Sequence, residues 1–137
     1  MISRLRQEKG FTIVELLIVI VVIAILAGLV LTAFNGIQED ARDTERRTDI
    51  NAVYEHLEFY AAKNGGVYPT AANLADTAWV SANLSGLDPE ALVDPNGGGY
   101  TYTVTPSGCD NTATNCESFT VGATLEDGNT FSRQSLQ

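Results

Sequence analysis

The sequence predicts an α+β fold in which a long N-terminal helix packs on a small three-stranded antiparallel sheet. A run without any charged residue extends from Leu16 to Leu31, and no proline occurs between Phe11 and Tyr68. Three segments rich in β-branched and aromatic residues follow near the C-terminus, separated by polar turns. The length of 137 residues suits one domain.

The predicted helix runs from about Phe11 to Asn64, and its two halves differ in character. The first half, 11–34, is long enough to span a membrane, because about 20 helical residues cross the bilayer core. In the second half, 35–64, apolar residues recur at three- and four-residue steps, which is typical of an amphipathic helix. We expect its polar face to carry Glu39, Asp43, Arg46, Arg47 and Glu55, with Asp43 and Arg47 forming an i,i+4 pair.

Residues 65–99 are predicted to form a connecting loop with short helical turns. Asn64–Gly66 supplies the left-handed conformation that ends the long helix. One helical turn is expected at Thr77–Asn83. A second is expected after Asp88, an N-cap residue followed by a proline at the first helical position. Asp94–Gly99 then forms a turn.

Residues 100–137 are predicted to form an antiparallel β-meander laid across the amphipathic half of the helix. Strands are expected at 100–105, 118–125 and 130–136, and a tight turn at 126–129 joins the last two.

Cys109 and Cys116 flank a polar loop between the first two strands. If this loop is exported, the pair is expected to form a disulfide, and two free thiols are the alternative. Zinc binding is not expected, since two cysteines with six residues between them lack partner ligands.

Gly10, Phe11, Thr12 and Glu15 stand at the start of the charge-free run. Glu15 is a candidate functional residue, because a carboxylate at the centre of a bilayer costs on the order of 2.5–3.5 kcal/mol. Together with the preceding basic residues, this segment resembles the leader region of type IV prepilins and the related pseudopilins. The resemblance covers Met1 to about Pro69, and the basic residues are Arg4, Arg6 and Lys9.

The resemblance implies a lollipop-shaped pilin fold and a processing pathway. A prepilin peptidase would remove the leader 1–10 by cutting between Gly10 and Phe11, and would methylate the new amine of Phe11. An inner-membrane assembly platform driven by a cytoplasmic ATPase would then polymerise the subunit through helix 11–34. Glu15 would pair with the Phe11 amine of the same or a neighbouring subunit. The chain would be a single-pass protein of the cytoplasmic membrane, N-terminus inside, before it enters an extracellular fibre.

The first functional interpretation is a structural subunit of a type IV pilus. The alternative is the major pseudopilin of a type II secretion system, which the Asp94-Pro95 turn and the run Asp43–Arg46 favour. A minor tip pilin for adhesion or DNA uptake is the third. Many type IV pilins carry a proline about twenty residues into the mature helix, where Thr32 stands here, so Gly28 and Thr32 mark the expected weak spot of this helix.

Composition narrows the remaining functional classes. The net charge is −9, and it becomes −11 without the first ten residues, which argues against nucleic-acid binding. No nucleophile–base pair or metal cluster is recognisable, so we expect neither an enzyme nor a cofactor. His56 is interpreted as a packed or solvated side chain. Weak candidates for calcium exist, but their spacing matches no known loop; they are Asp94, Asn96, Asp110, Asp127 and Asn129.

Overall fold

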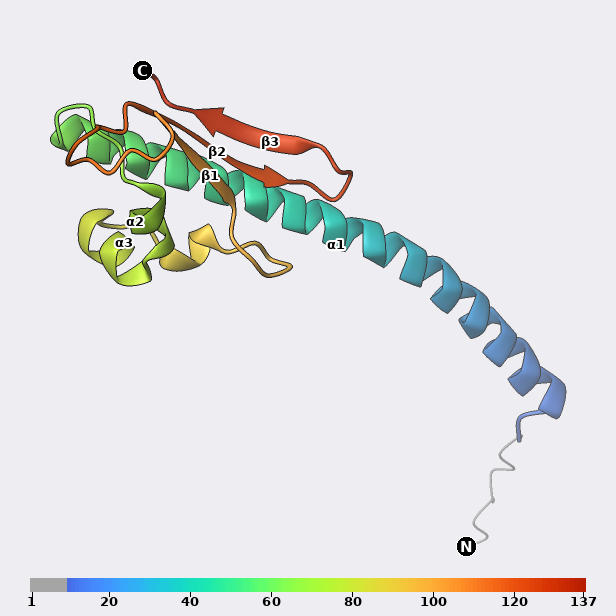
Figure 1. Ribbon diagram of the computed structural model, residues 1–137. Helices are drawn as coiled ribbons and strands as arrows, with labels where there is room; N and C mark the ends of the chain where they lie inside the picture. The colour runs from blue at the N-terminus through green and yellow to red at the C-terminus, as the bar shows by residue number, and fades with distance from the viewer. Residues whose placement is uncertain (1–9) are drawn as a thin grey trace, which may run out of the picture. The chain divides into compact units, whose positions relative to one another are not determined.

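The computed structural model describes residues 10–137, and it confirms the α+β fold (Figure 1). Two compact units divide the chain, one ending at Gln38 and one comprising Glu39–Gln137, which we call the head. The elements, in chain order, are α1 (Ile13–Lys63), α2 (Ala71–Ala75), α3 (Thr77–Asn83), the 3₁₀ helix η1 (Pro89–Leu92), β1 (Thr101–Thr105), β2 (Ser118–Thr124) and β3 (Thr130–Gln134).

Helix α1 contributes to both units and is continuous, including the expected weak spot between Gly28 and Thr32. It ends as predicted. The amide of Gly66 donates to the carbonyl of Ala61 at 2.8 Å, and Gly65 and Gly66 have φ values of 71° and 85°. Glycine adopts this left-handed conformation without steric cost, so these residues terminate the helix.

The three strands form an antiparallel sheet in the order β1-β2-β3, which confirms the predicted meander. Figure 1 shows the strands alongside the part of α1 that belongs to the head. Phe119, Val121 and Ala123 of β2 are buried on the helix side of the sheet. They join one apolar cluster with Ile50, Val53 and Leu57 of α1. Helix and sheet therefore share a single core.

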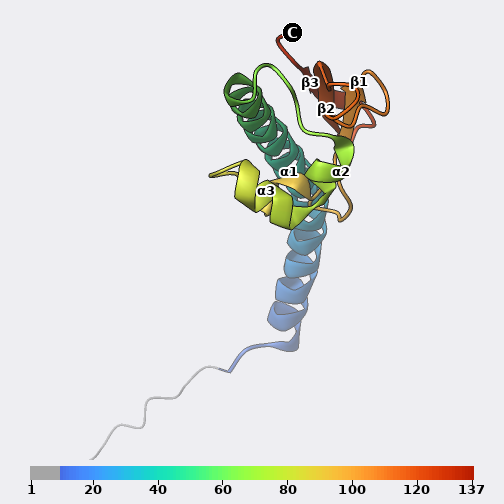
Figure 2. The ribbon, with the colours of Figure 1, turned by 60° about the vertical axis from the view of Figure 1, so that its left-hand side comes forward.

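The connecting segment is held by three capped helical turns. Asp76 Oδ1 accepts from the amides of Ala78 and Trp79 at the start of α3, and Asp88 Oδ1 accepts from the amide of Glu90 at the start of η1. Leu74, Val80 and Leu84 of this segment are buried in the head core. Figure 2 shows α2 and α3 beside the helix and the sheet.

Candidate assembly site

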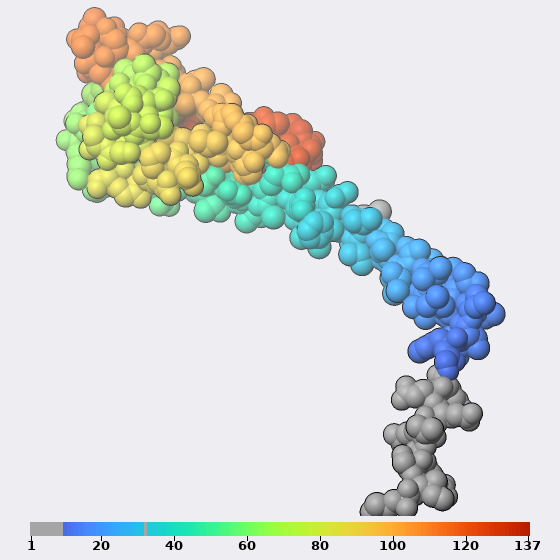
Figure 3. Space-filling view, turned by 90° about the horizontal axis from the view of Figure 1, so that it is seen from below, coloured from blue at the N-terminus to red at the C-terminus, as the bar shows by residue number. Residues whose placement is uncertain are grey.

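The first part of α1, in the unit that ends at Gln38, is an exposed apolar surface. Every large apolar side chain from Ile13 to Leu31 is at least 48% exposed. The helix is long and apolar enough to cross a membrane, with a mean hydropathy of 3.2 in its most apolar window. Figure 3 draws the side chains of this part of the helix in blue. Because burying one such side chain gains roughly 1.5–3 kcal/mol, this surface requires lipid or other apolar chains around it.

Thr12 and Glu15 form a reciprocal capping box at the start of α1. Glu15 Oε2 accepts from the Thr12 amide at 2.8 Å and from Thr12 Oγ1 at 2.7 Å, while the Glu15 amide donates to Thr12 Oγ1 at 3.2 Å. This arrangement satisfies amides that the first helical turn leaves without partners. The Glu15 carboxylate is therefore bound to Thr12, the residue that follows Phe11. Phe11 itself is 88% exposed.

Nothing in the described part of the structure requires a glycine at position 10. A Cβ added at this position would meet no atom within 4 Å, and the backbone is not left-handed. Residues 1–9 of the predicted leader lie outside the described residues. Gly10 and Phe11, the two residues joined by the predicted cleavage bond, are both exposed.

Arg46 is buried in the head and forms the centre of an ionic cluster. Only 4% of the residue is exposed. Its Nε and Nη2 bind the two carboxylate oxygens of Asp94 at 2.6 and 3.0 Å, and its Nη1 binds Asp43 at 2.7 Å and Glu126 at 2.9 Å. Arg42 Nε donates to the same Glu126 oxygen at 2.7 Å. The cluster therefore ties α1 to the turn after η1 and to the β2–β3 hairpin.

Two expectations about this helix face are wrong. Arg46 does not lie on a solvated face, because the turn at Asp94 and the hairpin at Glu126 fold over it. Asp43 pairs with Arg46 at i,i+3 instead of with Arg47. The Arg47 guanidinium lies 5.6 Å from the centre of the Phe131 ring, so it is drawn toward β3.

The cluster shifts the acidity of its members. Hydrogen bonds from Arg42 and then Arg46 lower the pKa of Glu126 from 4.5 to about 2. The hydrogen bonds from Arg46 likewise lower the pKa of Asp94, and those to Asp94 raise the pKa of Arg46. Glu126, Asp94 and Arg46 thus favour their ionised forms.

We expect the head to lose stability in acid because of Glu126. A carboxyl group whose pKa is depressed on folding stabilises the folded state above its unfolded pKa, here 4.5. That contribution disappears as the pH falls from about 4.5 to about 2. Thermal unfolding followed by circular dichroism should therefore show Glu126→Gln less stable than the native chain at pH 7, with the difference shrinking toward pH 2. A difference that stays constant over this range contradicts the assignment.

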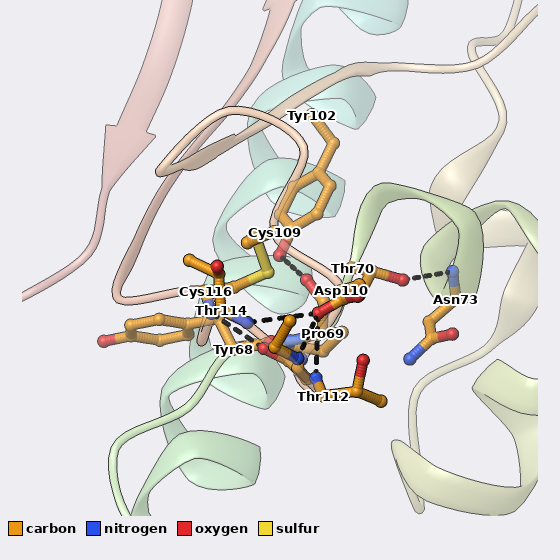
Figure 4. Close-up of a disulfide and its surroundings, with 12 residues drawn as sticks. Tyr68, Pro69, Thr70, Asn73, Tyr102, Cys109, Asp110, Thr112, Thr114 and Cys116 are labelled. Carbon is orange, nitrogen blue, oxygen red and sulfur yellow. Dashed lines mark hydrogen bonds between the residues drawn. A yellow bond between two sulfur atoms is a disulfide. The ribbon is translucent and has the colours of Figure 1, made fainter.

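The structure joins Cys109 and Cys116 in a disulfide with a Cα–Cα distance of 5.2 Å. Figure 4 shows the bridge beside the chain that follows α1. The Tyr68 amide donates to the Cys116 carbonyl at 2.9 Å, and the Tyr102 hydroxyl donates to the Pro69 carbonyl at 2.8 Å. The loop therefore fastens the exit from α1 to the sheet.

Removing the disulfide is expected to destabilise the head by about 2–2.5 kcal/mol, the chain-entropy value for so short a loop. The double variant Cys109→Ser/Cys116→Ser should show this loss in a chemical unfolding curve, and the reduced native chain should behave alike. If the oxidised and reduced chains unfold at the same denaturant concentration, the bridge has no such effect.

The predicted calcium candidates do not converge on one place. Asp94 binds Arg46, and Asn96 Nδ2 donates to Glu126 at 3.0 Å. Asp127 accepts from both the amide and the side chain of Asn129. Within residues 10–137 no group of three or more acidic, histidine or cysteine side chains is arranged to hold a metal ion.

Two features of the site were missed in the sequence. The spacing Thr12-x-x-Glu15 before an apolar run is the signature of a capping box, and it could have been read directly. Arg46 carried no comparable signal, since its partners Asp94 and Glu126 lie 48 and 80 positions away.

Known proteins are similar to parts of this chain. Residues 5–31 match the prokaryotic N-terminal methylation motif. The type II secretion system core protein G of Vibrio cholerae is 37% identical over 68 residues, which cover 50% of this chain and 46% of that protein. The corresponding protein of Aeromonas hydrophila is 35% identical over 95 residues, 69% of this chain and 63% of that protein.

A pilus component also matches. The type IV wide pilus major component PilA4 of Thermus thermophilus is 38% identical over 60 residues, which cover 44% of this chain and 46% of that protein. The chain thus spans about half to two thirds of the length of these relatives. No solved structure matches it at a significant level.

Proposed function

We infer that this chain, which belongs to the family of type IV pilins and type II secretion pseudopilins, is a structural subunit of a helical filament. Its polymerisation element is the apolar part of α1. The observation that carries this proposal is the exposure of that surface from Ile13 to Leu31, directly after the exposed Gly10-Phe11 bond. A helix of this kind is stable in lipid before assembly and among copies of itself afterwards.

The proposed pathway starts in the cytoplasmic membrane with the basic leader inside. A prepilin peptidase cuts after Gly10 and methylates Phe11, and an assembly platform with a cytoplasmic ATPase moves the subunit into the filament. Gly10 supports this pathway, because nothing in the described fold requires a glycine there. A narrow protease pocket would give glycine a use at this position that the fold itself does not. We assign no catalytic role to the chain itself.

The filament is proposed to be a type IV pilus exposed at the cell surface. A periplasmic pseudopilus is the second candidate, and one specific observation favours it. The similarity to protein G of Aeromonas hydrophila extends over 95 residues, more than α1 contains, so it includes part of the head. Electron microscopy of filaments sheared from the cell surface distinguishes the two. Surface filaments containing this chain support the pilus, and filaments confined to the periplasm support the pseudopilus.

Replacing Gly10 by valine is expected to abolish cleavage. In cells that contain a prepilin peptidase, mass spectrometry of the native chain should find an N-terminal Phe11 carrying one added methyl group, whereas Gly10→Val should retain residues 1–10. Gly36→Val is the matched control, since an added Cβ at Gly36 also meets no atom within 4 Å. The proposal fails if the native chain keeps its leader or begins at another residue.

A further inference from the structure

The sheet face turned away from α1 carries only hydroxyl, amide and glycine positions. Cross-strand partners share a face, and the register pairs Thr103 with Thr120 and Gly122 with Ser132 on this side. We call it the hydroxyl face, and its ten positions are Thr101, Thr103, Thr105, Ser118, Thr120, Gly122, Thr124, Thr130, Ser132 and Gln134. None of them carries a formal charge.

The hydroxyl face is regular and largely unengaged. Side chains on one face of a sheet repeat at about 6.6–6.8 Å along a strand and about 4.7–4.9 Å across strands. Among the described residues, Thr103 is the one member whose side chain forms a hydrogen bond within the chain, donating to the Thr120 carbonyl at 3.4 Å. A Cβ added at Gly122 would meet Phe131 O and Ser132 Cβ at 3.0 Å, so a side chain at the centre of the face would be tightly packed.

The surrounding surface determines which partner can approach this face. All five basic residues after Gly10 contact other residues of the chain. Two form ion pairs in the Arg46 cluster, and three lie over aromatic rings; they are Arg42, Arg46, Arg47, Lys63 and Arg133. The net charge without the first ten residues is −11. An anionic partner is therefore repelled by the head, and a cationic partner is attracted to its acidic surface instead of the hydroxyl face. Charge complementarity therefore favours a neutral partner at the hydroxyl face.

We propose that the hydroxyl face is the docking surface for a neutral, polyhydroxylated polymer, namely the surface of an uncharged polysaccharide. Its ordered hydroxyls can donate to and accept from sugar hydroxyls. Each such hydrogen bond replaces a hydrogen bond to water, so its net contribution to the binding free energy is small and a single head binds weakly. The proposal rests on the filament function in one respect: a filament repeats the face many times, and multivalency can strengthen binding by about 10²–10⁴-fold.

The test uses the full chain in phosphatidylcholine vesicles, where the apolar helix anchors many heads on one particle. Vesicles carrying the native chain should sediment with microcrystalline cellulose at least about tenfold more than empty vesicles. Thr103→Glu/Ser132→Glu, which places two charges on the hydroxyl face, should abolish that excess. The matched control is Ala72→Glu/Ala78→Glu, which adds the same charge at exposed positions of α2 and α3 and should retain it. Circular dichroism verifies that all three chains are folded.

Three outcomes overturn the proposal: no sedimentation of native vesicles, full binding by the sheet variant, or equal loss in the control. Shaping of ice crystals by the native chain without cellulose binding would instead assign the face to ordered water. The vesicle assay requires no filament and no processing. Its failure therefore leaves the filament function intact, and absence of filaments in cells leaves this result unaffected.

Discussion

Replacing Arg46 by methionine is expected to destabilise the head by about 3–5 kcal/mol. Methionine keeps most of the apolar stem but removes the charge that Asp43, Asp94 and Glu126 share. Three carboxylates, each about one-fifth exposed, would then face one another in a partly buried site. Because folded domains are stable by only about 5–15 kcal/mol, thermal unfolding should begin more than about 10 °C lower. Circular dichroism of the detergent-solubilised chain measures the shift.

Arg47→Met is the matched control for this prediction. Arg47 is the next residue along the helix, and its contact with the Phe131 ring is worth only about 0.5–1 kcal/mol. A second variant separates charge from packing. Arg46→Met combined with Asp94→Asn and Glu126→Gln removes the repulsion and should recover part of the lost stability. Equal destabilisation by the Arg46 and Arg47 variants, or no recovery in the combined variant, contradicts the proposed role of the cluster.

The long helix, the meander and the helical turns α3 and η1 could be predicted because each depends on short-range patterns, whereas α2 was not assigned from the sequence. Apolar periodicity marks α1, and β-branched and aromatic residues mark the strands. Asp76 and Asp88 cap their helices through amides two or three residues away. Boundaries shifted by one or two residues where long-range contacts decide them. Ser135, for example, lies past the end of β3 although its amide still donates to the Phe119 carbonyl at 3.0 Å.

The burial of Arg46 could not be predicted, because it depends on contacts between residues far apart in the sequence. On a helical wheel it neighbours Asp43 and Arg47, so a solvated face was the simplest interpretation. Arg46 is covered by Asp94 and Glu126, which belong to two turns distant in the sequence. A charged residue can be buried when its desolvation is offset by several carboxylates at once, and sequence periodicity contains no information about such partners. The disulfide, in contrast, was expected on the condition that its loop is exported, and the structure joins the two cysteines.

Glu15→Val is expected to leave cleavage intact and to reduce filament yield by more than tenfold. In the proposed filament the first turn of α1 would lie among apolar chains, where the positive amine of a processed Phe11 would need an anionic partner. An unpaired buried charge costs about 3–5 kcal/mol, and 1.4 kcal/mol already corresponds to a tenfold change in an equilibrium constant. Quantitative immunoblotting of sheared filaments measures the yield, and mass spectrometry of the membrane fraction confirms the Phe11 terminus.

Thr12→Ala tests whether that loss comes from pairing between charges or from a poorly started helix. The capping box makes the distinction necessary, since Glu15 Oε2 also accepts from the Thr12 amide. Thr12→Ala removes the hydroxyl that caps the Glu15 amide, at a cost of about 0.5–2 kcal/mol, yet it keeps the carboxylate. We expect this variant to assemble nearly as well as the native chain. If it fails as severely as Glu15→Val, helix capping explains the defect, and if Glu15→Val forms normal filaments, the carboxylate has no part in assembly.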